Sequence, residues 1–138
     1  MAFWRTYYHL IWATHNRQPL IQPEYEKGLY GYIKGKADAL GCILHAIGGV
    51  EDHIHLVVSI PPKLAVSEFV RRVKGGSAHY INHLSEEPGI LLKWQEGYGV
   101  FSLGGKQLER AKAYVNRQKE HHAQETILAA LERDSGDG

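Results

Sequence analysis

The chain has 138 residues, enough for one domain with a hydrophobic core of its own. Its 16 lysines and arginines nearly balance 15 aspartates and glutamates. The formal charge of +1 excludes a protein that holds nucleic acid through bulk positive charge. A single cysteine excludes an internal disulfide and favours a reducing, cytoplasmic location. No apolar run approaches the roughly 18 residues of a membrane span, and we expect no secretion signal.

The first half of the chain predicts a strand, a helix and a hairpin. Aromatic and β-branched residues favour the first strand, and a polar run ending at Pro19 breaks it. Pro23 suits the first turn of a helix, and Gly41 suits the position that follows its last turn. The predicted elements are a strand over Phe3–Thr14, a helix over Pro23–Leu40 and hairpin strands over Cys42–Gly49 and His53–Ile60.

The second half predicts two helices with two strands between them. Ser67 is a candidate N-cap for the first of these helices, which runs to Leu84. Gly75 and Gly76 inside it cost about 1 kcal/mol each relative to alanine, which indicates a kink or a close approach of the backbone to another group. The remaining elements are strands over Leu91–Glu96 and Gly99–Leu103, a helix over Lys106–His122, a helical piece to Leu131 and a disordered tail over Asp134–Gly138.

The order of these elements indicates the fold class. Strand, helix, strand, strand, helix, strand, strand, helix matches a split β-α-β arrangement. We therefore predict an α+β fold in which helices pack on a ferredoxin-like, or RNA-recognition-like, antiparallel sheet. The chain shows no internal repeat or linker, so one domain is expected over residues 1–133, followed by the tail at 134–138.

Two histidines alternate on the second strand of the predicted hairpin. Because side chains two apart on a strand share a face, His53 and His55 project together while Ile54 faces the other way. Two neutral imidazoles form half of a site for a divalent metal. Asp52, beside the pair, is placed to orient one imidazole. Taken alone, the pair is equally compatible with polar positions on a half-exposed strand.

Tyr114 and Gln118 lie four residues apart in the last predicted helix, so they share one of its faces. Arg110, Arg117 and Lys119 make this helix basic. A tyrosine with an ordinary pKa of about 10 is a weak nucleophile unless a metal or another cation favours its phenolate. A metal half-site together with a tyrosine and an amide predicts phosphodiester chemistry. The alternative is that Tyr114 is an ordinary aromatic residue of an amphipathic helix and has no catalytic role.

The basic residues predict a surface for nucleic acid. Arg71, Arg72 and Lys74 form the densest cluster, and Arg110 and Arg117 add to it from the last helix. The functional interpretation is a phosphate-binding surface, and the alternative is a solvated helix face. Further histidines stand outside any motif and are assigned no role: His9, His15, His45, His79 and His83.

Several short runs stand in a characteristic order along the chain. They are Asp52–Leu56, Val73–Ser77, Trp94–Ser102, Tyr114–Gln118 and Glu120–His122. In this order they resemble the single-domain tyrosine transposases of the HUH superfamily, in the group named after insertion sequence two-hundred. Members of this family mobilise bacterial insertion sequences as single-stranded DNA. The resemblance spans Phe3 to about Leu131, nearly the whole chain.

The resemblance implies a role for each candidate residue. His53 and His55 match the two metal-binding histidines of the family motif, and Tyr114 matches the nucleophile. Gln118, one turn later, matches the third metal ligand. The implied reaction cleaves and rejoins single-stranded DNA through a 5′-phosphotyrosine intermediate. The implied cofactor is a divalent metal, Mg²⁺ or Mn²⁺.

The resemblance also implies partners. These are single-stranded DNA with hairpins at the ends of the element, and a second copy of the chain. In such a homodimer the tyrosine helix acts in trans, and Gly104–Gly105 just before that helix is a candidate hinge for the exchange. His121 and His122 stay open as alternatives to Gln118 in the metal shell.

Three other interpretations stay open. The first is an inactive or domesticated relative that binds hairpin DNA or RNA without cutting it. The second is a histidine-triad nucleotide hydrolase, against which Val57 stands where a third alternating histidine is expected. The third is a ferredoxin-like scaffold without chemistry.

Overall fold

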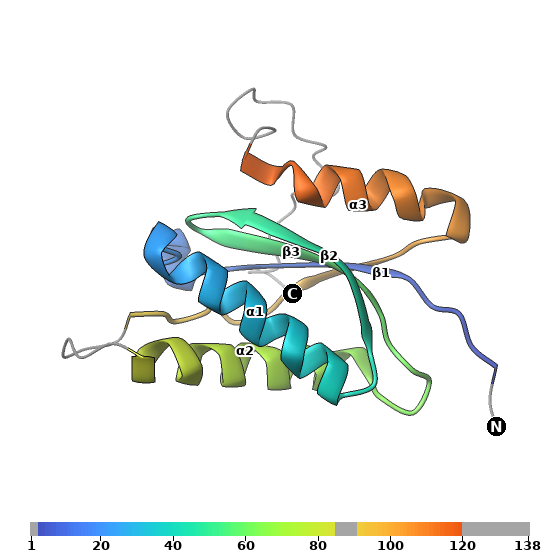
Figure 1. Ribbon diagram of the computed structural model, residues 1–138, viewed down its shortest axis with the longest axis horizontal. Helices are drawn as coiled ribbons and strands as arrows, with labels where there is room; N and C mark the ends of the chain where they lie inside the picture. Colours follow the sequence, from blue (N-terminus) through green and yellow to red (C-terminus); the bar gives the residue numbers. More distant parts are fainter. Residues whose placement is uncertain (1–2, 85–90, 120–138) are drawn as a thin grey trace.

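The computed structural model describes residues 3–84 and 91–119. Helices and the strands of one antiparallel sheet follow one another along this part of the chain (Figure 1). The longer elements are β1 (Tyr8–Ala13), α1 (Pro23–Ala39), β2 (Ile43–Val50), β3 (His53–Ser59), α2 (Val66–Leu84), β4 (Gly99–Ser102) and α3 (Leu108–Asn116). Short 3₁₀ turns at His15–Arg17 and Gly105–Gln107 follow β1 and precede α3.

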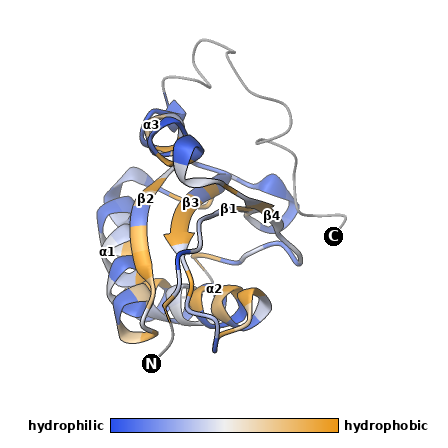
Figure 2. Ribbon diagram, turned by 90° about the vertical axis from the view of Figure 1, so that its right-hand side faces the viewer, coloured by the Kyte–Doolittle hydropathy of each residue, from blue (hydrophilic) through white to orange (hydrophobic). Residues whose placement is uncertain are grey.

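The sheet has four strands in the order β2-β3-β1-β4, and each neighbouring pair is antiparallel. Helices α1 and α2 cover one face, whereas α3 lies across the other (Figures 1 and 2). This is the split arrangement that the sequence predicts, and the α+β fold class is confirmed. No helix within the described ranges is both long and apolar enough to cross a membrane.

Strand β3 divides its side chains between the two faces, and all seven of its residues are buried. Ile54, Leu56 and Val58 join the larger hydrophobic core with α1 and α2. Val57 belongs to a smaller cluster with residues of α3. Because the side chains of a strand alternate, His53 and His55 share the α3 side of the sheet with Val57.

Helix α1 ends as its glycine predicts. Gly41 takes a φ of 77°, in the left-handed region that glycine adopts without steric cost. Its N–H donates to the backbone carbonyl of Asp38 at 3.1 Å, and the N–H of Cys42 donates to the backbone carbonyl of Ala37 at 2.9 Å. These two bonds form a Schellman motif, which satisfies carbonyls at the end of the helix and directs the chain into β2.

Helix α2 runs without a break through Gly75 and Gly76, so the prediction of a close approach is confirmed and the kink is excluded. A Cβ on Gly76 would lie 2.1 Å from the Tyr32 hydroxyl of α1. The small residue therefore lets the two helices pack closely. Ser67 is not the N-cap, because the helix already begins at Val66 and Ser67 lies within its first turn.

The predicted strand over Leu91–Glu96 is wrong. Only Trp94 of this segment forms a bridge, opposite Thr14, and its neighbours make the two backbone bonds of that bridge, from the His15 N–H to the Lys93 carbonyl and from the Gln95 N–H to the Ala13 carbonyl, both 2.8 Å long. Asn82 accepts from the N–H groups of Leu91 and Leu92 at 2.7 and 2.8 Å. Nζ of Lys74 donates to the carbonyls of Gln95 and Gly97, at 2.6 and 3.0 Å. Side chains of α2 thus satisfy several backbone groups that a longer backbone ladder would otherwise pair.

Two element boundaries also differ from the prediction. The first strand begins at Tyr8 rather than Phe3, and the last helix ends at Asn116 with a break at Arg117. The predicted remainder of that helix to His122, the helical piece to Leu131 and the tail at 134–138 lie outside the described residues.

Candidate active site

The two histidines of β3 lie side by side under α3. Both are fully buried, and their ring centroids are 5.1 Å apart. A buried imidazole must find hydrogen-bond partners within the protein, because water cannot reach it. The contacts of the two rings therefore decide which nitrogen of each is available for chemistry.

His53 is held by the residue that precedes it. Its Nδ1 lies 2.7 Å from Oδ1 of Asp52, whose other oxygen pairs with Arg17 Nε at 3.6 Å. The hydrogen bond from His53, helped by the charge of Arg17, lowers the pKa of Asp52. An ionised carboxylate can only accept, so this contact favours the tautomer of His53 with its proton on Nδ1, although the guanidinium Nη2 of Arg17 also lies 3.2 Å from that nitrogen. This leaves Nε2 as the nitrogen able to bind a metal, and the orienting role expected for Asp52 agrees with this geometry.

Arg17 reaches Asp52 from a strained turn. Asn16 and Arg17 both have positive φ, 53° and 52°, which side-chain-bearing residues adopt rarely. The amide side chain of Gln95 holds the turn by accepting from the N–H of Asn16 at 2.9 Å. The sequence shows a polar break here but indicates no role for Arg17. Positive φ at consecutive non-glycine residues is a feature that only coordinates reveal.

His55 is held by His9, a histidine that stands outside any sequence motif. His9 of β1 brings Nε2 within 2.7 Å of Nδ1 of His55, and both side chains are fully buried. The register pairs Ile11 with His55 and His9 with Val57, so the two histidines are diagonal neighbours on one face. The signal in the sequence is a histidine inside an otherwise aromatic and aliphatic strand.

Tyr114 reaches the histidines from α3. Its side chain is 5% exposed, and its ring stands edge-on to His55 with centroids 5.9 Å apart and planes at 82°. The ring of His9 is 6.3 Å away. Tyr114 and the histidine pair belong to the same chain here, so α3 lies on its own sheet. The expected meeting of tyrosine and histidines is thus present within one subunit.

Gln118 lies just beyond the end of α3 and is 1% exposed. Its Nε2 donates to the Tyr114 carbonyl at 3.4 Å. Its Oε1 is buried without a hydrogen-bond partner among the described residues. A buried amide oxygen left in this way is a suitable donor to a cation. The break at Arg117 means that Gln118 and Tyr114 do not share a regular helix face, but they remain neighbours.

The candidate donor atoms of His53, His55 and Gln118 are of chemical types that bind divalent cations. Among residues 3–84 and 91–119, no three His, Cys, Asp or Glu side chains gather to hold a metal. Two imidazole nitrogens and the Gln118 oxygen would make a mixed set. Oxygen donors suit both Mg²⁺ and Mn²⁺. Imidazole donors suit Mn²⁺, a transition metal, better than Mg²⁺. The alternatives His121 and His122 lie outside the described residues.

Helix α3 is seated on the sheet through a glycine. A Cβ on Gly48 would lie 2.1 Å from the carbonyl oxygen of Val115, closer than any real contact. Gly48 also pairs with His55 across β2 and β3. The apolar cluster beneath the helix is small, comprising Ala46, Val57, Ala111, Tyr114 and Val115. The position of Tyr114 therefore depends on this close backbone contact.

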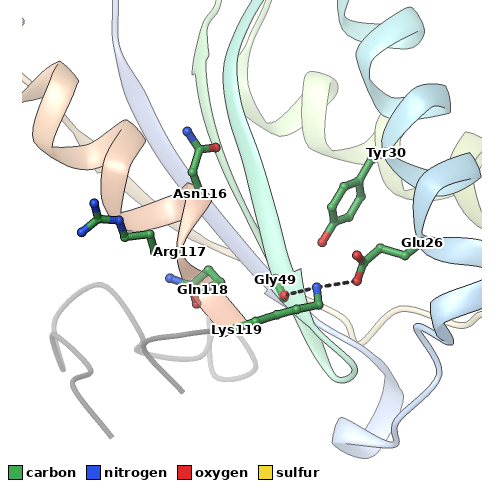
Figure 3. Close-up of a pocket in the computed structure, with 7 residues that line it drawn as sticks. All are labelled: Glu26, Tyr30, Gly49, Asn116, Arg117, Gln118 and Lys119. Carbon is green, nitrogen blue, oxygen red and sulfur yellow. Dashed lines mark hydrogen bonds and ion pairs between the residues drawn. The ribbon is translucent and has the colours of Figure 1, made fainter. Parts of the chain in front are cut away.

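A pocket of about 360 Å³ opens beside Gln118, at the edge of the sheet between α1, β2 and the end of α3 (Figure 3). Lys119 closes one side by donating to the Gly49 carbonyl at 3.0 Å and to Glu26 at 2.7 Å. The Tyr30 hydroxyl is buried there, and desolvation raises the pKa of Tyr30. The Lys119 contacts tie the segment after Tyr114 to the rest of the domain.

The basic residues expected to bind DNA are not gathered on one surface. Arg71 and Arg72 are exposed on α2, across the sheet from α3, and both pair with Glu68. Burial lowers the pKa of Lys74, whose ammonium group binds backbone carbonyls instead of facing solvent. The other two basic candidates, Arg110 and Arg117, are exposed on α3 and just after it. Only these two lie on the same side as Tyr114.

Comparison with known proteins identifies the family. The sequence pattern described as "Transposase IS200 like" matches residues 2–118, most of the chain. The chain belongs to the IS200-like transposase family. This confirms the resemblance noted from the sequence and makes the protein a member of a family of DNA-processing enzymes.

Relatives of this IS200-like transposase cover most of its length. It is 26% identical over 115 residues to the ISDra2 transposase TnpA of Deinococcus radiodurans, covering 80% of this chain and 82% of that protein. It is 24% identical over 121 residues to the transposase for insertion sequence element IS200 of Salmonella typhimurium. That match covers 85% of this chain and 79% of the relative.

Solved structures share the fold. A crystal structure of a Deinococcus radiodurans protein, described as a candidate transposase, superposes with a TM-score of 0.67 at 25% identity. It covers 86% of this chain and 95% of its own. A REP-associated tyrosine transposase bound to a REP hairpin superposes with a TM-score of 0.61 at 15% identity, covering 92% and 76%.

The close contact between Gly48 and the backbone of α3 can be tested. We expect Gly48→Ala to push Val115 and the neighbouring Tyr114 away from β2, because the added methyl group would overlap the helix backbone. Hydrogen–deuterium exchange should show lost protection in α3 while α1 and α2 stay protected. Gly35→Ala is the matched control, since nothing lies within 4 Å of its added carbon. Wild-type protection of α3 in the Gly48 variant would contradict this account.

Proposed function

We propose that this IS200-like transposase cleaves and rejoins single-stranded DNA at the ends of an insertion sequence. Tyr114 would be the nucleophile, and the product of the first step would be a 5′-phosphotyrosine. The observation that carries the proposal is the Tyr114 ring, buried edge-on to His55 at 5.9 Å. Each imidazole of the histidine pair has its Nδ1 engaged, which supports Nε2 as the nitrogen that would bind a metal.

The proposal includes a divalent cation, Mg²⁺ or Mn²⁺, held by His53, His55 and Gln118. The supporting observations are the engaged Nδ1 atoms of the histidines and the buried amide oxygen of Gln118. When bound, such a cation would neutralise charge that develops on the scissile phosphate. The protein residues would hold their donors rigidly, because all three side chains are buried.

In the first step the Tyr114 hydroxyl oxygen attacks phosphorus in line with the 3′-oxygen that leaves. A tyrosine–phosphorus bond forms, the bond to the 3′-oxygen breaks, and the tyrosine proton is balanced by the new 3′-hydroxyl. In the second step another DNA 3′-hydroxyl attacks the phosphotyrosine and restores the tyrosine. One ester replaces another in each step, so the reaction needs no ATP.

The proposed substrate is DNA that folds into hairpins near the ends of the element. The solved structure of a fold relative bound to a REP hairpin supports this choice of partner. Arg110 and Arg117 are exposed on the tyrosine side and are the described basic candidates best placed for phosphate contacts. Arg71 and Arg72 would require DNA that extends to the opposite face. Binding through phosphates should weaken as salt rises.

A covalent adduct tests the nucleophile. A single-stranded oligonucleotide from the palindrome flanking the gene, labelled on the 3′ side of the cut, should become attached to the protein in Mg²⁺ or Mn²⁺. Tyr114→Phe should reduce the adduct to background, because it removes the attacking oxygen. Tyr25→Phe, on α1 against the larger core, should retain it.

The variants separate the rival functions. An adduct that persists in Tyr114→Phe would assign the chemistry to another residue. Hairpin binding without any adduct in the wild type would favour a binding module. Unchanged cleavage in a His53→Ala, His55→Ala double variant would remove the cation from the proposal.

The proposed assembly is a homodimer in which α3 leaves the sheet of its own subunit, where it lies in this structure, and serves the histidines of the other subunit. Complementation tests this arrangement. We expect a mixture of Tyr114→Phe chains with His53→Ala, His55→Ala chains to form adducts, because one mixed site would then hold an intact tyrosine and an intact histidine pair. A mixture as inactive as each variant alone would mean that α3 acts only on its own sheet.

A further inference from the structure

We propose that His9 is a positioning residue, which fixes the tautomer of His55 so that Nε2 of His55 can bind the cation. The inference rests on the proposed function, which gives His55 its role as a ligand. The bond between His9 Nε2 and His55 Nδ1 is 2.7 Å long, and neither side chain has any exposed surface. The contact is therefore not shared with solvent.

The two strands fix this contact. His9 and His55 belong to β1 and β3, the central pair of the sheet, with register His9–Val57 and Ile11–His55. Their ring centroids are 5.0 Å apart, and the rings of Phe101 and Tyr114 pack around His9 at 6.1 and 6.3 Å. His9 is thus confined by β4 on one side and by α3 above, with little freedom to rotate away.

One proton lies between two ring nitrogens, and its position decides the chemistry of His55. If His9 donates from Nε2, Nδ1 of His55 accepts, and the remaining proton of neutral His55 sits on Nε2 and blocks a metal there. If His55 donates from Nδ1, its Nε2 has a free electron pair. Metal binding through Nε2 therefore requires His9 to be the acceptor, with its own proton on Nδ1.

His9 thus does for His55 what Asp52 does for His53, with one difference. Asp52 is a carboxylate that can only accept from His53 when ionised, whereas His9 is an imidazole that can accept or donate. The pair of ligands is consequently supported by one charged and one neutral acceptor. Partners of this kind orient metal-binding histidines, and their loss lowers metal affinity by about 10- to 100-fold.

Variants of His9 separate positioning from packing. His9→Phe keeps the ring in its aromatic surroundings but removes the acceptor. His9→Gln keeps a carbonyl oxygen near the place of Nε2. We expect His9→Phe to weaken Mn²⁺ binding by about 10- to 100-fold, measured from the electron paramagnetic resonance of free Mn²⁺, and His9→Gln to recover most of this affinity. The unfolding midpoint without metal should not fall in His9→Phe as it would if packing were lost.

Several outcomes would overturn the proposal. They are wild-type Mn²⁺ affinity in His9→Phe, losses in both variants that follow a fall in the metal-free unfolding midpoint, or no Mn²⁺ binding by the wild type. Nitrogen NMR of the wild type with Mg²⁺ gives a check that needs no variant. It should show a protonated Nδ1 on His55 and an unprotonated Nε2 on His9, and the reverse would contradict the inference.

The adduct assay on the same samples keeps the two proposals apart. Metal-dependent adducts with an Mn²⁺ affinity insensitive to His9→Phe would leave the proposed function standing and remove His9 from it. Mn²⁺ binding that depends on His9, in a protein that forms no adduct, would support the positioning role and reject the proposed function.

Discussion

Strand β3 is buried on both faces and still carries two imidazoles, and this constraint governs the rest of the structure. Buried polar groups need partners, and the partners found here come from two directions. Asp52, the partner of His53, is adjacent to it in the chain, whereas His9, the partner of His55, belongs to the neighbouring strand β1. Both contacts engage Nδ1. The burial of these two histidines thus bears on the chemistry as well, because their partners engage Nδ1 of both rings on the face of the sheet that α3 covers.

The two faces of the sheet serve different purposes. Helices α1 and α2 pack on the larger core, which extends from Leu10 and Trp12 to the loop at Trp94. The α3 face holds a much smaller apolar cluster and all the candidate catalytic groups. Helix α3 relies on the glycine seat at Gly48 and on the Lys119 contacts to stay in place. Elements with few buried apolar contacts open most easily, so we expect α3 to move, with Tyr114, at a lower cost than unfolding of the domain.

Local patterns predicted a good part of this molecule. The alternation around Ile54, the glycine after α1 and the spacing of Tyr114 and Gln118 all depend on neighbours in the chain, and the structure agrees with each except for the break at Arg117. His9 was missed because its partner is 46 residues away and is set by strand register. The strand expected at Leu91–Glu96 is reduced to one bridge for a similar reason, since side chains of α2 satisfy several of its backbone groups. The sequence favours Lys74 as a DNA contact, and the structure shows in addition that its ammonium group binds the backbone carbonyls of Gln95 and Gly97.

The central claim is that a cation bound at His53 and His55 lies next to Tyr114. Paramagnetic broadening by Mn²⁺ tests it directly, because the effect falls steeply with distance. In protein with ring-labelled tyrosine, substoichiometric Mn²⁺ should broaden the Tyr114 signal before those of the other seven among the eight tyrosines. The His53→Ala, His55→Ala variant should lose this selectivity. A Tyr114 signal that stays sharp while distant tyrosines broaden would contradict the account.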